Sequence, residues 1–150
     1  GVRPAISVGL SVSRVGSAAQ VKAMKQVAGT VKLDLAQFRE LAAFAQFGSD
    51  LDEATRAKLE RGKRIVEVFK QAQFQPVAVP VQVAILWAVQ NGYLDDVDVD
   101  EIKDTQDSIA TFLQDRKADL VKKITTVGEV SDEIKADLKA ALDEYKSANK

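Results

Sequence analysis

Histidine and cysteine are both missing from this chain of 150 residues. Without cysteine there can be no disulfide and no thiolate metal site, and without histidine the commonest general base and zinc ligand are gone. These two absences exclude most self-contained catalytic designs. What remains for chemistry is carboxylates, Lys, Arg, hydroxyls and backbone amides, and no metal site is predicted.

Long apolar runs and a surplus of charge of one sign are also lacking. The best candidate for a membrane span, residues 77–89, is interrupted by Pro80 and Gln82 and is too short for a bilayer core. Twenty-one basic against twenty-two acidic residues give a net charge of −1, which offers no broad attraction for a phosphate backbone. We therefore expect neither a membrane-spanning segment nor a nucleic-acid partner.

The composition is that of an ordinary globular protein, with 46% apolar and 29% charged residues. A protein of this length can bury roughly 68–70% of its unfolded surface, so a real hydrophobic core is possible. No internal repeat, low-complexity tract or Pro/Gly/Ser-rich linker divides it. The one clear boundary is a change from period two to helical period between Arg14 and Val21, which separates residues 1–20 from residues 21–150.

The opening segment alternates between apolar and small polar residues, with Ile6, Val8, Leu10 and Val12 on one face. This period is typical of a half-buried strand. A lone strand cannot satisfy its own backbone donors and acceptors, so either its sheet partners lie outside this sequence or the segment is frayed. We expect the chain to be a fragment of a larger protein.

Helical periodicity begins after that segment and predicts about five helices. Ser17-Ala18-Ala19-Gln20 has the form of a capping box, so a first helix is expected from Ser17 to Phe47-Gly48, with a bend at Gly29-Thr30. Asp52 or Ser49 can cap a second helix that ends near Gln73. Gly62 lies inside this second helix and predicts a close contact between helices, since a mid-helix glycine otherwise costs about 1 kcal/mol.

Three further helices are expected in the second half of the chain. Pro80 suits the first position of a short, central helix that contains Trp87 and closes at Asn91-Gly92. The acidic stretch 95–100 precedes a fourth helix that runs to Gly128, and Ser131 caps the last one. The predicted fold class is all-α, a helical bundle of about five helices preceded by a short β-strand remnant.

A self-sufficient hydrolase is the least favoured function. The only Gly-Lys pair, Gly62-Lys63, is followed by Arg64 and has Ala57 where a phosphate loop needs its first glycine. The neighbouring carboxylates at 95–96 and 132–133 fall where helix starts favour negative charge, so we expect them to be structural rather than an acid and base pair.

The most specific pattern is Pro-Ala-Ile-x-x-x-x-Ser-x-Ser-Arg-Val-Gly-Ser-Ala-Ala-Gln at residues 4–20. Two further blocks follow in register, Lys-Gln-Val-Ala-Gly at 25–29 and Glu-Leu-Ala-Ala-Phe-Ala-Gln-Phe-Gly-Ser-Asp-Leu-Asp at 40–52. Together they resemble the C-terminal part of the alpha subunits of rotary F-type ATP synthases. The resemblance is dense to about Asp95 and looser beyond; Ser7 departs from the Asn or Asp usual in the family. Residues 1–20 then correspond to the end of a nucleotide-binding domain and residues 21–150 to a C-terminal helical domain.

The resemblance implies a role for Arg14 as an arginine finger, a guanidinium that reaches the terminal phosphate bound on a neighbouring beta subunit. A fixed planar cation stabilises the charge that spreads over a transferring phosphoryl group, which is worth about 10³–10⁵ in rate in related systems. Without the surrounding motif, an arginine beside a turn is more often a solvated surface group.

The resemblance also places four residues around the adenine of a non-catalytic nucleotide: Arg3, Pro4, Gln71 and Gln73. Amide side chains can pair with the donor and acceptor edge of adenine, although Gln71-Ala72-Gln73 also fits a plain polar helix end. ATP or ADP with Mg is expected in an intact complex, and no tight binding by this chain alone. Residues 47–52 resemble the turn that faces the rotating central shaft, and equally an ordinary acidic turn.

The implied partners are the beta and gamma subunits and other subunits of the complex, which is peripheral to an energy-transducing membrane. That membrane would be the bacterial plasma membrane, on its cytoplasmic side, or the mitochondrial inner membrane, on its matrix side. The chain alone is expected to have no enzymatic activity. The alternative is a free-standing helical interaction module that shares descent with the family and has no catalytic role.

Overall fold

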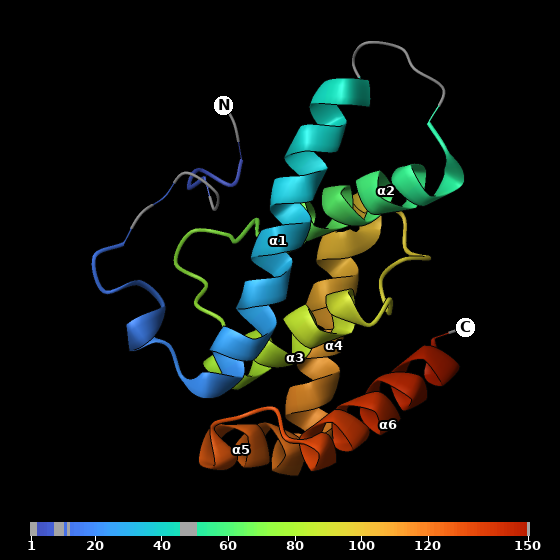
Figure 1. The fold of residues 1–150 in the computed structure, drawn as a ribbon. Helices are drawn as coiled ribbons and strands as arrows, with labels where there is room; N and C mark the ends of the chain where they lie inside the picture. The colour runs from blue at the N-terminus through green and yellow to red at the C-terminus, as the bar shows by residue number, and fades with distance from the viewer. Residues whose placement is uncertain (1–2, 8–10, 12, 46–50, 150) are drawn as a thin grey trace.

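The computed structural model describes residues 3–7, 11, 13–45 and 51–149, and over these residues the fold is built from helices (Figure 1). In sequence order the elements are η1 (Gly16–Ala19), α1 (Lys22–Ala45), α2 (Glu53–Val68), α3 (Val79–Gln90), η2 (Val99–Glu101), α4 (Ile102–Arg116), α5 (Ala118–Val127) and α6 (Asp132–Ala148). The predicted all-α class is confirmed.

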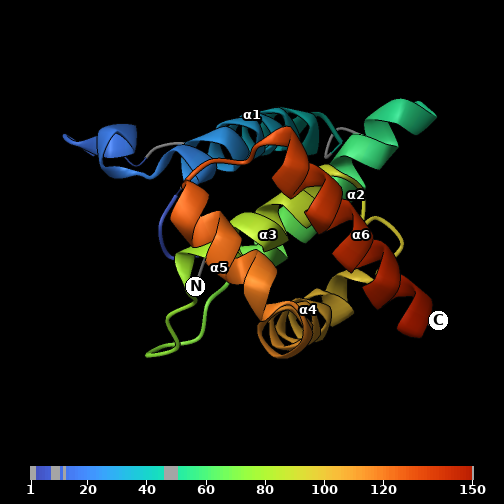
Figure 2. The same cartoon turned by 90° about the horizontal axis from the view of Figure 1, so that it is seen from below.

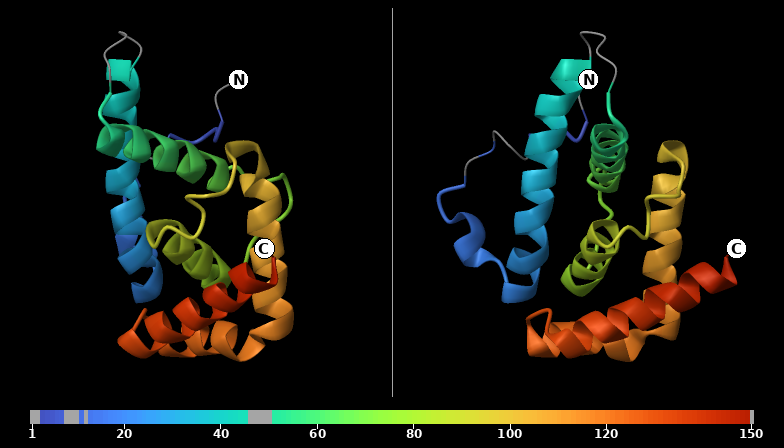
Figure 3. Two further views of the ribbon diagram at one scale, coloured as in Figure 1. Left: turned by 90° about the vertical axis from the view of Figure 1, so that its right-hand side faces the viewer. Right: turned by 45° about the vertical axis from the view of Figure 1, so that its right-hand side comes forward.

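Helix α3 is the centre of the bundle. It lies between α1 and α4, while α5 and α6 run across one end (Figure 3). When the bundle is viewed from that end, α5 and α6 lie nearest the viewer and cover the lower ends of the helices behind them (Figure 2). The sequence explains this position, because α3 is apolar on nearly every side and buries most of its residues: Val81, Val83, Ala84, Ile85, Leu86, Ala88 and Val89. Trp87, predicted in the core, is half-buried and packs against it.

Gly62 makes the predicted close contact between helices. A Cβ atom at position 62 would overlap with the Cβ atom and ring of Phe38 on α1. The missing side chain therefore lets α2 approach α1 closely enough for Phe38 to lie over its backbone. The interpretation of Gly62 is confirmed.

The start of α1 is bonded to the turn between α5 and α6. The Gln26 side-chain amide donates to the Val130 carbonyl oxygen at 3.4 Å and accepts from the Val130 backbone N–H at 2.7 Å. The backbone N–H of Ala23 donates to the carbonyl oxygen of Gly128 at 2.8 Å. These bonds join residues more than a hundred positions apart and satisfy backbone groups that helix ends leave unpaired.

Helix ends follow the predicted capping chemistry in the body of the chain. The Asp52 carboxylate accepts from the Thr55 backbone N–H at 2.8 Å and starts α2, and the Ser131 hydroxyl accepts from the Ile134 N–H at 3.3 Å and starts α6. Pro80 lies in the first turn of α3. The alternative cap, Ser49, lies outside the described residues.

Ahead of α1 the prediction was wrong about the capping box. Ser17 falls in the 3-10 turn η1, Gln20 is extended, and α1 begins only at Lys22. The local side-chain bond at this turn comes from Ser13, whose hydroxyl accepts from the Gly16 N–H at 3.0 Å. Helix α1 is continuous through Gly29 and Thr30, where a bend was predicted.

No strand occurs among residues 3–7, 11 and 13–20, and the stretch 3–6 forms bends. Val8, Leu10 and Val12 lie outside the described residues. The described backbone bond of this segment is local, since the Ser11 N–H donates to the Ser7 carbonyl oxygen at 2.8 Å, and it is not a pairing between strands.

The predicted fourth helix is in fact two helices. Lys117 leaves the helical region with φ −128° and ψ 32°, so α4 ends at Arg116 and α5 begins at Ala118, which gives six α-helices in the described residues where about five were expected. No Gly or Pro marks this break. The Lys117 ammonium is instead fixed by tertiary contacts, 2.6 Å from the Glu144 carboxylate on α6 and 5.9 Å from the centre of the Phe112 ring.

Candidate functional site

Arg14 lies at the surface, in the bend directly before η1. The turn that follows has its own local bonds, from the Gly16 N–H to the Ser13 hydroxyl and from the Ala18 N–H to the Val15 carbonyl oxygen at 3.1 Å. Gly16 has φ +53°, a conformation that favours glycine. Within the described residues no ion pair engages the guanidinium. The protein thus presents Arg14 from an exposed, locally bonded turn.

The four residues predicted around adenine lie on two separate segments. Arg3 is exposed and Pro4 half-buried in the opening bend, whereas Gln71 and Gln73 are exposed in the connection between α2 and α3. The Gln71 side-chain amide donates to the Gln75 carbonyl oxygen within that connection. No hydrogen bond between described residues joins the two segments, and the placement of the four residues around adenine stays a prediction.

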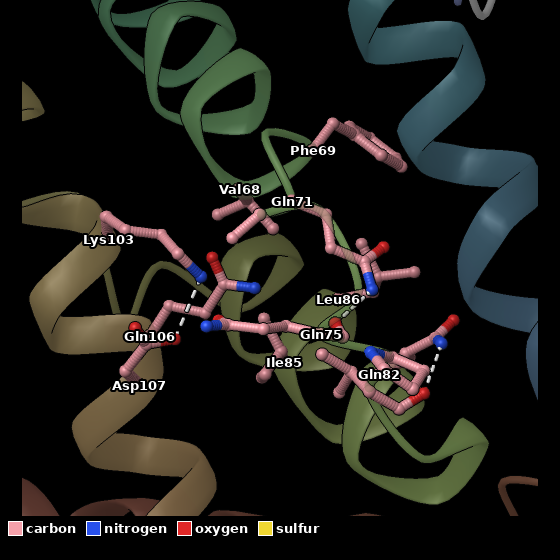
Figure 4. A pocket seen from close by; sticks show the side chains of 13 residues that line it. Val68, Phe69, Gln71, Gln75, Gln82, Ile85, Leu86, Lys103, Gln106 and Asp107 are labelled. Atoms are coloured by element: carbon pink, nitrogen blue, oxygen red, sulfur yellow. Dashed lines mark hydrogen bonds and ion pairs between the residues drawn. The ribbon is translucent and has the colours of Figure 1, made fainter.

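A cavity lies where the end of α2 and the connection 69–78 meet α3 and α4. Its volume is about 280 Å³. Figure 4 shows Lys103, Gln106 and Asp107 of α4 on one side of it and the glutamines of the connection on the other. Val68, Phe69, Ile85 and Leu86 form apolar walls. Sequence reasoning did not find this cavity.

Gln106 is the one buried polar residue in the described part of the protein, with 8% of its surface exposed. Its Oε1 is buried and has no hydrogen-bond partner among the described residues. Such an acceptor costs about 1–3 kcal/mol when left unpaired and calls for an explanation. The sequence did carry a signal for Gln106. It lies four residues after Ile102 and three before Ile109 on α4, where the helical stripe requires an apolar side chain.

The carboxylate pairs, interpreted as structural, are all placed beside cations or at a helix start. Asp95 pairs with Arg61, and its hydrogen bond raises the pKa of that guanidinium. Asp96 lies 2.8 Å from the Lys146 ammonium, which lowers the pKa of the carboxyl. Asp132 and Glu133 occupy the first turn of α6, as expected. Asp95 and Asp96 instead lie in the turn before η2, so their role is ion pairing rather than capping.

Tyr93 connects the same turn to α6. Its hydroxyl donates to the Asp143 carboxylate at 2.8 Å, and burial together with this bond raises the pKa of Tyr93 to about 12. The Lys139 ammonium, 2.7 Å from the same carboxylate, is the larger cause of the lowered pKa of Asp143. This cluster anchors α6 and has no feature of a catalytic centre.

The described residues contain no group of three or more acidic side chains that could hold a metal ion. None of the helices they form is both long and apolar enough to cross a membrane.

Comparison with known proteins gives a consistent result. Residues 20–145 match the family described as ATP synthase alpha/beta chain, C terminal domain. Over 147 residues the protein is 54% identical to the ATP synthase subunit alpha of Thioalkalivibrio sulfidiphilus, an alignment that covers 98% of this sequence and 29% of that relative. It is 56% identical to the ATP synthase subunit alpha of Dehalococcoides mccartyi, over 97% of this sequence and 29% of the relative. The chain thus spans less than a third of the length of each.

Proposed function

This protein belongs to the family of C-terminal domains from ATP synthase alpha and beta subunits, and on that premise we propose that it works as the C-terminal part of an alpha subunit in a proton-driven ATP synthase. The observation that carries the proposal is the identity of 54% and 56% to two alpha subunits over nearly the whole sequence. The resemblance found in the sequence is confirmed at this level.

In this proposal Arg14 acts in trans, as the arginine finger of a catalytic site on a neighbouring beta subunit. Two properties of the protein support the assignment. Arg14 lies inside the most specific sequence block, and its guanidinium is exposed at a turn with its own hydrogen bonds. An exposed cation on a locally ordered turn can be presented to a partner without unfolding the bundle.

We further propose that Arg3, Pro4, Gln71 and Gln73 contact the adenine of a non-catalytic nucleotide in the intact subunit, with the phosphates and Mg bound by residues outside this sequence. The amide groups of both glutamines are at the surface, where a ligand can reach them. The sequence has no phosphate loop, so its own affinity for ATP or ADP should be weak.

The helical bundle would then pack against the beta and gamma subunits around the rotor, and the complex would be peripheral to an energy-transducing membrane. Large apolar side chains at the surface support contact with other subunits; the most exposed on α1 are Leu33 at 65% and Phe44 at 68%. The alternative function is a free-standing interaction module, which would share these surfaces but have no use for Arg14.

The decisive test is steady-state ATP turnover by the assembled complex that carries Arg14→Ala. We expect turnover to fall by about 10³–10⁵, because the developing charge on the phosphoryl group loses its fixed cation. Arg14→Lys should lose most of the rate as well, since an ammonium cannot reproduce the planar fork of a guanidinium.

Arg39→Ala, which removes an exposed arginine from α1, is the matched control. It should assemble and turn over like the parent complex. If the Arg14→Ala complex assembles and keeps near-normal turnover, the finger role is wrong. The chain would then contribute packing without the finger, and the free-standing module would be favoured only if the chain does not assemble into the complex.

A further inference from the structure

We propose that Asn91-Gly92, at the end of α3, is a site of spontaneous deamidation that is closed in the folded protein and opens when the bundle unfolds. The proposal does not depend on any role in ATP synthesis. It rests on a reactive dipeptide, since glycine has no side chain to hinder attack on the asparagine before it, and on the backbone geometry that holds this dipeptide.

The reaction needs only water as a partner. The backbone nitrogen of Gly92 attacks the side-chain carbonyl carbon of Asn91 and loses its proton, and a five-membered succinimide forms as ammonia leaves. Water then adds to one of the two ring carbonyls and opens the ring. One opening gives aspartate, and the other gives isoaspartate, in which the main chain runs through the former side chain. The net change is one water consumed and one ammonia released.

The attacking nitrogen is turned away from its target in the folded protein. Asn91 has ψ 15°, so the Gly92 nitrogen lies nearly eclipsed with the Asn91 nitrogen, whereas ring closure requires it to lie beside the Cβ atom. The side chain is held as well, since its Nδ2 donates to the Trp87 carbonyl oxygen at 2.8 Å. Asn91 is exposed to solvent, so geometry rather than burial closes the site.

The bonds that end α3 resist the rotation that the reaction needs. The Gly92 N–H donates to the Val89 carbonyl oxygen at 3.2 Å, and the Tyr93 N–H donates to that of Ala88 at 3.0 Å. A large rotation about ψ of Asn91 would move both donors and break both bonds. Gly92 adopts φ +78°, the left-handed conformation typical of such a helix end.

The end of α3 is also tied into the core on both sides of the dipeptide. Val89 before it and Leu94 after it are 2% and 1% exposed. Asp95, in the same turn, pairs with Arg61 on α2. Opening this end exposes core side chains and separates it from α2, so its free energy should approach that of global unfolding.

The isoaspartate product prevents the same helix end from forming again. It adds one atom to the main chain at position 91, which lies between the donors and acceptors of the bonds from Gly92 to Val89 and from Tyr93 to Ala88. Those bonds then no longer fit together. A molecule that has remained unfolded is thereby marked chemically, and it refolds to a less stable bundle.

The competing explanation is local fraying, because the end of a helix can open while the rest of the protein stays folded. Deamidation would then proceed in molecules whose core is intact. The two explanations differ in whether the reaction rate follows the unfolded fraction.

The experiment measures deamidation at residue 91 of the complete protein over a series of guanidinium chloride concentrations, by mass spectrometry of the peptide that contains it. Circular dichroism of the same samples gives the unfolded fraction, extrapolated linearly below the transition. We expect the rate to be proportional to that fraction, and therefore about 10³-fold or more slower in buffer than in the fully unfolded protein. Leu113→Ala, on α4, should shift both curves to lower denaturant by the same amount.

Asn149, the other asparagine of the sequence, is the internal control because it precedes Lys150. In the fully unfolded protein it should react more slowly than Asn91, since the lysine side chain hinders the attack. Asn91→Gln, which would need a larger ring, should show no mass gain at that position. The proposal is overturned by a rate in buffer above that set by the unfolded fraction, by a rate that Leu113→Ala leaves unchanged, or by equal rates at both asparagines after unfolding.

Discussion

The segment before α1 and the helical body that follows it differ in how their side chains meet the solvent. In residues 3–7, 11 and 13–20 no side chain is buried, and Ile6 and Val15 are 68% and 63% exposed. Every helix from α1 to α6 contributes residues to a single core. The first segment has the most specific sequence pattern and the least structure, whereas the body has a looser pattern and all of the packing.

This contrast separates two kinds of residue. Arg14 belongs to the first segment, where the sequence is explained by what a partner would require rather than by burial in this protein. Leu113 and Ile134 belong to the body, where each side chain is fully buried and only packing explains its identity. Changes in the first segment should therefore affect function with little effect on stability, and changes in the body should do the reverse.

The sharpest test compares Leu113→Ala with Arg14→Ala in chemical denaturation. Leu113 is fully buried on α4, so its truncation should lower the free energy of unfolding by about 2–5 kcal/mol through lost transfer energy and a cavity. Arg14→Ala should change it by no more than about 0.5 kcal/mol. A loss of stability in Arg14→Ala comparable to that of Leu113→Ala would break the contrast.

Substitutions at two glycines of the helical body should give the next largest difference in stability. Gly62→Ala forces a Cβ atom into Phe38 and should cost about 1–3 kcal/mol of unfolding free energy. Gly29→Ala, in a helix interior with open space around it, should instead stabilise the protein by about 0.5–1 kcal/mol. Phe38→Ala removes the ring but keeps the Cβ atom that also overlaps, so it should relieve only part of the Gly62→Ala penalty. Equal thermal midpoints for the two glycine variants would contradict the close contact of α1 and α2.

Removal of a helix cap should have a smaller effect. Ser131→Ala deletes the hydroxyl that accepts from the Ile134 N–H and should lower the free energy of unfolding by about 1 kcal/mol. Ser108→Ala, at an exposed position inside α4, is the control and should be neutral or slightly stabilising. If both variants unfold at the same denaturant concentration, Ser131 is not a functional cap.

The smallest predicted effect is the alkaline loss of stability from Tyr93. Burial and the bond to Asp143 raise the pKa of Tyr93 from 10.0 to about 12, so its contribution is complete below pH 10 and disappears as the pH rises toward 12. Because Tyr93 is partly exposed, solvent screening limits this to about 1 kcal/mol or less. Ultraviolet titration of tyrosinate should show the late ionisation, and Tyr93→Phe should remove it.

The capping residues and the spacing of apolar residues predicted the helices of the body well. Asp52, Ser131 and Asn91-Gly92 mark real helix ends because their bonds are local and need only residues three or four positions away. The break at Lys117 could not be predicted, since its ion pair with Glu144 depends on how α6 packs. The Ser17 capping box was wrong, since Ser17 lies in the 3-10 turn η1 and α1 begins only at Lys22.

The residues of the candidate site also differ in whether the sequence alone could identify them. Arg14 could be named from the sequence because the motif around it is specific, and its finger role remains a prediction. The cavity at Gln106 could not be named, because its walls come from three separate stretches of the sequence and only packing brings them together. Gln106 is a polar residue in an apolar stripe, and this signal was visible in the sequence. The stripe alone does not tell whether such an amide has a structural role or binds a ligand.

The pairing of Gln26 with Val130 has a consequence for the order in which the protein is made. A ribosome releases Gln26 long before Val130, so the first turn of α1 must wait for almost the whole domain before its partner groups exist. Contacts between such distant positions form late, because closing a long loop is costly until other helices have packed. Within this domain α1 is synthesised before α5 and α6, and its start is thus among the last parts to be fully held in place.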